Sequence, residues 1–356
     1  MNKHFDVKPN INLPKLPFHL LNDKIFTDNF KINKHKVDKT EEEDEPDVPG
    51  QANLVQNQNI NKFMKPMIIA KNKSNCLDDL KQLLDNSEKF NKAQMVSRLG
   101  PYSDPDFEPT IQSLIGFQIP HNMTFLQSLK WYRPNVYFSN IDKISVYNRI
   151  APDDIHQGSL GDCYFLAACS AIAQKHERLE RLFLRGGKQN PDGLYAVAIC
   201  LNGIWEEILL DDVIPCTPRS KKPAFNTSKE GELWVMLLEK AWAKVHDGYM
   251  NISAGLTREA LRDLTGASAK TFFTEKSGPK HHDQWNILCD AFKKGHIMCA
   301  GSDDLSGGSD AYIEKIGICG SHAYSLLGVY EVLNGRTVSL GTSSNNSKLI
   351  NYLFNI

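Results

Sequence analysis

The stretch that decides this chain is residues 157–168, which read QGSLGDCYFLAA. Cys163 follows a turn-forming Gly-Asp pair and opens a run of residues typical of a helix. A cysteine at a helix N-terminus lies beside unpaired backbone N–H groups and the positive end of the helix dipole, which favour the nucleophilic thiolate. Gln157 can bring a side-chain amide to the same sulfur. We therefore predict a thiol nucleophile of lowered pKa with part of an oxyanion-binding site.

Hydrophobic periodicity and turn signals place further elements along the chain. Helical spacing runs from residue 162 to about 183, and an Asn202-Gly203 hairpin is expected to join two alternating segments. The remaining predicted elements are a buried helix over 230–245, a helix starting at Thr257, a helix over 282–292, a strand over 297–300 and a hairpin over 323–340 that turns at Asn334-Gly335.

Several blocks in this order carry a family resemblance. Residues 157–168 resemble the active-site cysteine motif of the calpain family of intracellular cysteine proteases. The likeness extends from about residue 99 to about residue 340 and includes GIWEEILLDD (203–212), ELWVMLLEKAWAK (232–244), LRDLTG (261–266) and SHAYSL (321–326).

The resemblance implies an α+β, papain-like core with two lobes. Residues 95–254 would form a helical lobe with Cys163, and residues 255–356 a β-rich lobe with His322 that is incomplete at its C-terminal end. The leader, residues 1–94, is rich in Asn, Lys and Asp and includes an acidic run broken by proline. Such segments bury too little apolar surface to offset chain entropy, so we expect this leader to be mostly disordered.

The resemblance also implies roles for individual residues. Cys163 would be the nucleophile and His322 the general base, with oxyanion donors from the Gln157 side chain and the Cys163 backbone N–H. Family members orient the histidine with the asparagine of an Asn-Pro-Trp-Gly block. Asn345 stands where that asparagine is expected, but no Pro-Trp-Gly follows it.

Calcium is implied in the same way. Asp154 and Glu232 match two carboxylate positions of the family's first core calcium site, and carboxylates suit this hard cation. A glycine-rich loop with Asp303, Asp304 and Asp310 is either a further calcium loop or, on the interpretation we prefer, simply solvated. Zinc is not expected, because the Cys319-x-x-His322 pair has no second short-spaced pair to complete four ligands.

Composition limits the partners and the location. The formal net charge is −1, so nothing favours nucleic acid as a partner. No apolar stretch approaches the roughly 20 residues that span a bilayer. The eight cysteines have irregular spacing, which is typical of free thiols in a reducing compartment. We therefore expect a cytoplasmic protein that acts on protein substrates in extended conformation and has regulatory protein partners.

Two functions compete on this basis. The first is a calcium-dependent cysteine endopeptidase, a hydrolase that carries out limited proteolysis of intracellular proteins. The second is a calpain-like protein without activity that acts by binding partners. Gln157, Cys163 and His322 favour the enzyme, whereas the missing Pro-Trp-Gly favours the binding protein.

Overall fold

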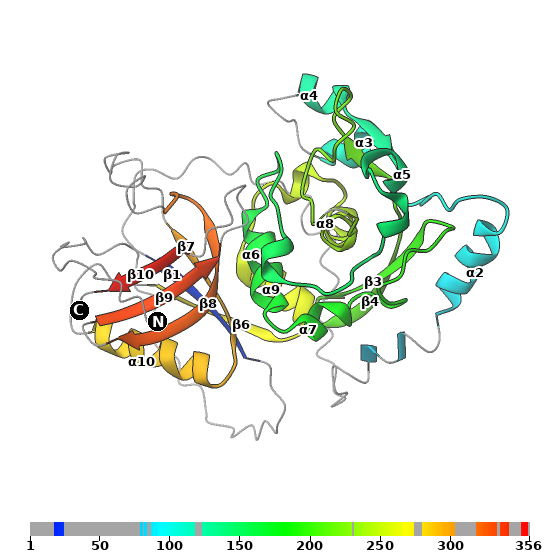
Figure 1. Ribbon diagram of the computed structural model, residues 1–356. Coiled ribbons are helices and arrows are strands. Elements are labelled where there is room, and N and C mark those ends of the chain that lie inside the picture. The colour runs from blue at the N-terminus through cyan, green and yellow to red at the C-terminus, as the bar shows by residue number, and fades with distance from the viewer. Residues whose placement is uncertain are drawn as a thin grey trace, which may run out of the picture. The chain divides into compact units, whose positions relative to one another are not determined.

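The computed structural model describes residues 18–24, 79–80, 82–83, 87–117, 123–229, 231–273, 280–302, 318–332, 335–341 and 350–354. All of them belong to one compact unit formed by residues 1–25 and 76–356. The helices are α2 (Glu88–Ser97), α3 (Ile111–Ile115), α4 (Met123–Ser128), α5 (Pro134–Tyr137), α6 (Cys163–Ala173), α7 (His176–Glu180), α8 (Trp234–Val245), α9 (Thr257–Thr265) and α10 (Lys280–Lys293) (Figure 1). The strands are β1 (Phe18–Lys24), β2 (Lys130–Tyr132), β3 (Leu194–Leu201), β4 (Ile204–Asp211), β5 (Ile214–Cys216), β6 (Ser268–Phe273), β7 (Ile297–Ser302), β8 (Ala323–Val332), β9 (Gly335–Gly341) and β10 (Ile350–Phe354).

Helices α6 and α8 form the centre of the larger hydrophobic cluster. Every residue of α6 after Cys163 is buried, because small and apolar side chains surround this helix on all sides. Phe165 of α6 stacks on Trp242 of α8, with ring centroids 5.1 Å apart and planes 19° apart. This close aromatic contact holds α6 against α8.

The helix predicted over residues 162–183 is wrong in its extent. It ends at Ala173, and α7 begins only at His176. Lys175 has extended backbone angles, φ −122° and ψ 94°, which redirect the chain so that Leu179 becomes fully buried. The helix predicted over 230–245 likewise starts later, at Trp234.

The first predicted hairpin is confirmed. Strands β3 and β4 pair in antiparallel register from Leu194 opposite Asp211 to the turn. Asn202 and Gly203 both have positive φ, 54° and 82°, as a two-residue type I′ turn requires.

A six-stranded antiparallel sheet forms the second core region, in the order β10-β9-β8-β7-β1-β6. Helix α10 lies along β7 and β8 (Figure 1), and a separate hydrophobic cluster fills the space between them, with Trp285 and Tyr324 as its largest members. The predicted hairpin over 323–340 is confirmed as β8 and β9, while Asn334 of its predicted Asn334-Gly335 turn lies outside the described residues.

Two parts of the leader differ from the predicted disorder. Residues 18–24 form β1, which pairs with β6 on one side and β7 on the other. Helix α2 spans the predicted boundary at residue 94, and its Phe90 is buried in the core. Composition measures how much apolar side chain can be buried, whereas β1 is held through backbone hydrogen bonds on both sides, which composition does not report.

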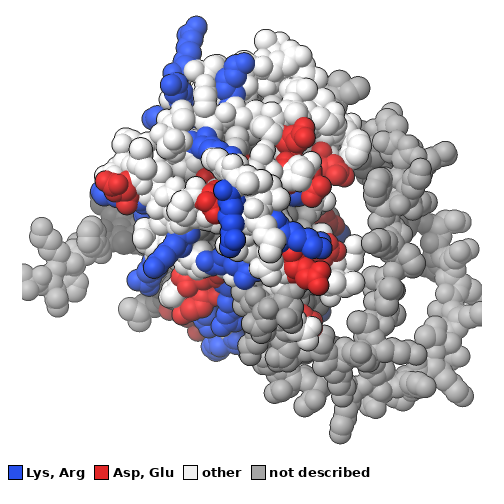
Figure 2. Space-filling model, turned by 90° about the vertical axis from the view of Figure 1, so that its right-hand side faces the viewer, with Lys and Arg blue, Asp and Glu red and all other residues white. Residues whose placement is uncertain are grey.

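Charged side chains of both signs are mixed on the face shown in Figure 2. In the described part of the chain, every helix is too short or too polar to span a bilayer.

Candidate active site

Cys163 is the first residue of α6 and is half-buried, with a free thiol. Its own backbone N–H and that of Tyr164 lie near the sulfur and act to lower the thiol pKa, as expected at a helix start. A third backbone donor is the N–H of Ala323, the first residue of β8. This contact brings the thiol against the residue that follows His322.

The prediction of a lowered thiol pKa is wrong for this geometry. Burial raises the pKa of Cys163 above its ordinary value, and the neighbouring Asp162 carboxyl raises it further. The three backbone N–H groups act in the opposite direction but do not compensate for the lost solvation. The helix N-terminus therefore stabilises the thiolate without making it the favoured form.

His322 is held at its backbone by Ser302 of β7. The His322 N–H donates to Ser302 Oγ at 3.1 Å, and the Ser302 N–H donates to the His322 carbonyl at 2.9 Å. The imidazole packs edge-on against the Tyr324 ring at a centroid distance of 4.9 Å. Burial lowers the pKa of His322, so the ring is neutral at pH 7.

A buried hydroxyl pair joins the element that carries the thiol to the element that carries the imidazole. Ser170 Oγ of α6 and Ser325 Oγ of β8 are 3.0 Å apart. Helix α6 also contacts β7, where the Cys299 thiol lies 3.5 Å from the Ala167 carbonyl oxygen. The relative placement of Cys163 and His322 thus depends in part on polar contacts between α6 and these strands.

The segment before the nucleophile is bound to residues 224–227. His156 and Thr227 exchange two backbone hydrogen bonds of 2.9 Å, and the Ser159 hydroxyl donates to the Ala224 carbonyl at 2.8 Å. A Cβ on Gly158 would lie 2.0 Å from the Phe225 carbonyl oxygen, so only glycine permits this approach. The glycine of the motif is therefore required by backbone contact.

Gln157 lies in this segment and is half-buried. Its side-chain Nε2 donates to the Leu160 carbonyl at 3.0 Å. An amide nitrogen carries two hydrogens, so this bond uses one of them and fixes the plane of the amide. The residues from 157 to 161, which we call the donor loop, hold that amide upstream of Cys163.

The two predicted metal-binding carboxylates are both buried, at 0% exposure for Asp154 and 6% for Glu232. Glu232 Oε1 accepts the Asn148 backbone N–H at 3.1 Å, whereas its Oε2 is buried without a hydrogen-bond partner. Asp154 is paired with the Lys229 ammonium, whose pKa is raised chiefly by a hydrogen bond to Asp154 and also by the Glu232 charge. A lysine thus supplies the positive charge at this pair.

Other predicted site residues lie outside the description. Asn345 and the loop carboxylates Asp303, Asp304 and Asp310 are not among the described residues. Strand β9 ends at Gly341, opposite Ser325, near the end of β8 that follows His322.

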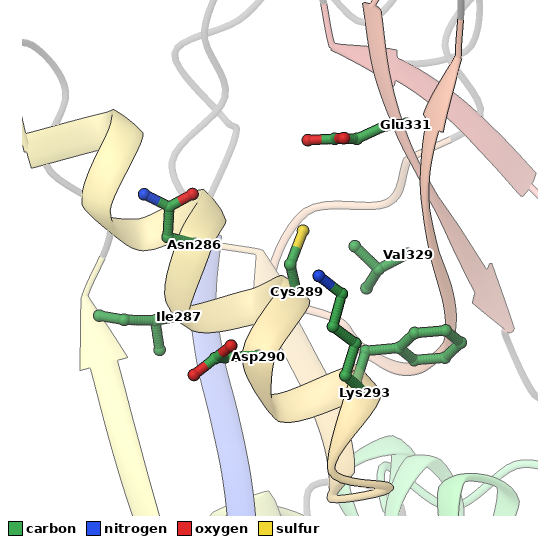
Figure 3. Close-up of a pocket in the computed structure, with 8 residues that line it drawn as sticks. Asn286, Ile287, Cys289, Asp290, Lys293, Val329 and Glu331 are labelled. Atoms are coloured by element: carbon green, nitrogen blue, oxygen red, sulfur yellow. The ribbon is translucent and has the colours of Figure 1, made fainter.

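A cavity of about 530 Å³ lies elsewhere, between α10 and β8. In Figure 3 the side chains of Cys289 and Lys293 point from the helix toward the strand that carries Val329 and Glu331. Its lining includes neither Cys163 nor His322 and contains no histidine that could act as a base for Cys289. We therefore place the candidate chemistry at Cys163.

A thiol at a helix start beside a histidine-bearing strand is the arrangement used by thiol hydrolases. The family model described as "Calpain family cysteine protease" matches residues 102–350. The chain belongs to the calpain family of cysteine proteases.

Individual relatives agree with this assignment. The chain is 33% identical over 250 residues to the calpain-type cysteine protease ADL1 of Oryza sativa subsp. japonica, an alignment that covers 67% of this chain and 11% of that protein. It is 30% identical over 252 residues to the calpain-1 catalytic subunit of Bos taurus, covering 70% and 34% of the two chains. The chain therefore spans between about a tenth and a third of the length of these relatives.

Three residues of this site were not found by sequence reasoning. Ser302 holds the His322 backbone, Asn226 binds the donor loop, and Glu239 lies behind Cys163. Each acts through a contact between segments far apart in the chain, and none belongs to a local motif that identifies its partner.

Proposed function

We propose that this chain is a calpain-type cysteine endopeptidase that hydrolyses extended segments of protein substrates. The observation that carries the proposal is the placement of α6 against β8, with the Ala323 backbone N–H close enough to the Cys163 sulfur to act on its pKa, which sets the thiol beside the strand start that bears His322. In this proposal the α6 region and the β7–β10 sheet belong to the two lobes of a papain-like core. Substrate would lie between them.

The reaction follows from the groups present. His322 takes the proton of the Cys163 thiol as the sulfur attacks the substrate carbonyl carbon, and the carbonyl oxygen becomes an oxyanion. The Cys163 backbone N–H and the Gln157 side-chain amide donate to that oxygen. His322 then gives its proton to the leaving amine, and a thioester remains. Water adds to this thioester with His322 as base, which releases the acid and restores the thiol.

The resting geometry supports a latent state. Burial favours the neutral thiol and the neutral imidazole, so the ion pair that attacks substrate is not the ground state here. This observation also favours the second candidate, an inactive calpain-like protein that binds partners. The two candidates differ in whether any condition activates Cys163.

Calcium is our proposed activator, with Asp154 and Glu232 as carboxylate ligands. The buried Glu232 Oε2, which has no hydrogen-bond partner, and the buried Asp154 carboxylate, which already holds the Lys229 ammonium, fit a cation that takes oxygen ligands. Within the described residues no group of three or more His, Cys, Asp or Glu side chains is arranged around a metal position, so backbone carbonyls and water would complete the coordination. Bound calcium would neutralise the pair in place of the Lys229 ammonium.

A cytoplasmic location and regulatory protein partners complete the proposal. None of the seven cysteines in the described part of the chain forms a disulfide, which is consistent with a reducing compartment.

The test is labelling with a peptidyl epoxide, with and without calcium, followed by mapping of the modified cysteine. Cys319 is exposed and serves as the internal control, and Cys169 is the buried control. We expect Cys163 to be modified fastest and faster still with calcium, together with cleavage of an unfolded protein substrate that Cys163→Ala abolishes. Labelling of Cys163 no faster than of Cys319 in both conditions would establish the inactive alternative.

A further inference from the structure

A buried carboxyl pair lies directly behind the candidate nucleophile. Asp162, which precedes Cys163, is 0% exposed, and Glu239 of α8 is 2% exposed. The two carboxyl groups are close enough to hydrogen-bond each other, and Asn226 binds both of them. Ionised carboxylates only accept hydrogen bonds, so this contact requires a proton on one of the two groups.

The donors around the pair lead to the same conclusion. Asp162 Oδ2 accepts the Asn226 side-chain amide at 2.5 Å, and Glu239 Oε2 accepts the Asn226 backbone N–H at 3.2 Å. Asp162 Oδ1 is buried and receives no hydrogen bond from an amide, hydroxyl or ammonium group. Although Asp162 is the N-cap of α6, its side chain makes no capping bond to that helix. Its carboxyl group is therefore committed to Asn226 and Glu239.

Asn226 extends this contact to the donor loop. Its Oδ1 accepts the backbone N–H of Gly158 at 3.2 Å, one residue after Gln157. We propose that Asp162 and Glu239 share one proton and, through Asn226, act as positioning residues that hold the donor loop at Cys163. The catalytic part of this inference rests on the function proposed above, whereas the shared proton does not.

The surroundings of the pair favour retention of that proton. Its titratable neighbours are Cys163, Tyr164 and Cys169 of α6 and Tyr249 after α8, all neutral acids that supply no positive charge. Burial raises the pKa of Asp162 to about 7 and raises that of Glu239 well above its ordinary value. The folded protein thus keeps a proton that the unfolded chain releases above pH 4. Its stability is therefore expected to fall as pH rises from about 4 to about 7.

The shared proton is tested by infrared spectroscopy of the carboxyl C=O band. At pH 6 the wild-type protein should show a protonated buried carboxyl, Glu239→Gln should lose that band, and Glu207→Gln, which changes another buried carboxyl, should keep it. Glu239→Gln should also flatten the decline of unfolding midpoint between pH 4 and 7, because its amide donates to Asp162 at every pH. Absence of the band in wild type, or an unchanged pH slope in Glu239→Gln, overturns the shared proton.

The positioning role is tested without relying on activity. Asn226→Ala should speed backbone hydrogen exchange in residues 157–161, while Glu207→Gln leaves it unchanged. If the wild type cleaves substrate, Asn226→Ala should also lower kcat by up to about 100-fold with little change in KM, because a displaced donor affects the transition state. If backbone hydrogen exchange in residues 157–161 is equally fast in Asn226→Ala and in wild type, the positioning role is overturned. An inactive wild type with faster exchange in Asn226→Ala would instead count against the proposed function alone.

Discussion

Replacing Lys240 by Met removes a buried positive charge from α8. Lys240 is 1% exposed, and its ammonium is paired with Asp211 of β4 and donates to the Val213 carbonyl at 2.8 Å. Methionine keeps an unbranched side chain, one heavy atom shorter than that of lysine, and loses the charge. Because Lys240 follows Glu239 in the sequence, the substitution also tests how α8 is anchored behind the candidate site.

The expected loss follows from what remains around Asp211. Breaking a buried pair by removing one partner costs about 3–5 kcal/mol, because the other charge is left without compensation. Asp211 keeps the backbone N–H of Asp104 at 2.8 Å and that of Val213 at 2.9 Å, which partly replace the ammonium. We therefore expect about 3 kcal/mol, a large part of the roughly 5–15 kcal/mol by which a domain is stable.

The assay is urea unfolding at pH 7, with wild type and variants compared at constant m value. The double variant Asp211→Asn with Lys240→Met should recover part of the loss, because no unpaired charge remains. Lys92→Met is the exposed control, since Lys92 pairs with Glu88 only at 3.7 Å on the surface of α2, and its midpoint should not move. A loss below about 1 kcal/mol for Lys240→Met, or a double variant less stable than the single one, would refute this reasoning.

Three further predictions concern the site. Gln157→Ala should lower turnover about 100- to 1,000-fold in a peptide-hydrolysis assay while the unfolding midpoint stays unchanged, and a loss below roughly tenfold contradicts the donor role. Lys229→Gln should tighten calcium binding roughly tenfold, equivalent to about 1.4 kcal/mol, because the ammonium no longer competes for Asp154. Calorimetry measures the affinity, and the exposed Lys222→Gln should leave it unchanged. Equal calcium affinities for the two variants would contradict the competition between Lys229 and calcium. Burial lowers the pKa of His322, so the folded protein binds fewer protons at this ring than the unfolded chain, and stability is lost as pH falls below 6.5. His322→Gln should reduce that acid loss in a pH series of unfolding midpoints, and an unchanged series would show that this ring does not contribute.

Local signals predicted most of the regular structure. The Asn202-Gly203 turn specifies its own backbone conformation, and Thr257 begins a helix as expected. The break at Lys175 had no such signal, because apolar residues continue at helical spacing on both sides of it. Strand β1 was also missed, since the strands that pair with it, β6 and β7, lie about 250 and about 280 residues further along the chain.

In the candidate site, too, local sequence predicted some features, while contacts between distant segments determined the others. The Cys163 motif predicted a thiol at a helix start, and the structure places it there. The motif could not give the sign of the thiol pKa shift, which depends on how deeply the folded chain buries the sulfur. Nor could it reveal Asn226 or Glu239, which meet Asp162 only after α8 has folded against α6.

The hydrogen bond between Gly158 and Asn226 joins residues 68 positions apart in the sequence. Contacts of such long range require loop closure and tend to form late in folding. A nascent chain that has already formed α6 would therefore carry the Cys163 thiol before the donor loop is held in place by Asn226. The proposed peptidase activity would therefore be absent until folding is complete, so an unfinished chain would not cleave other proteins during synthesis.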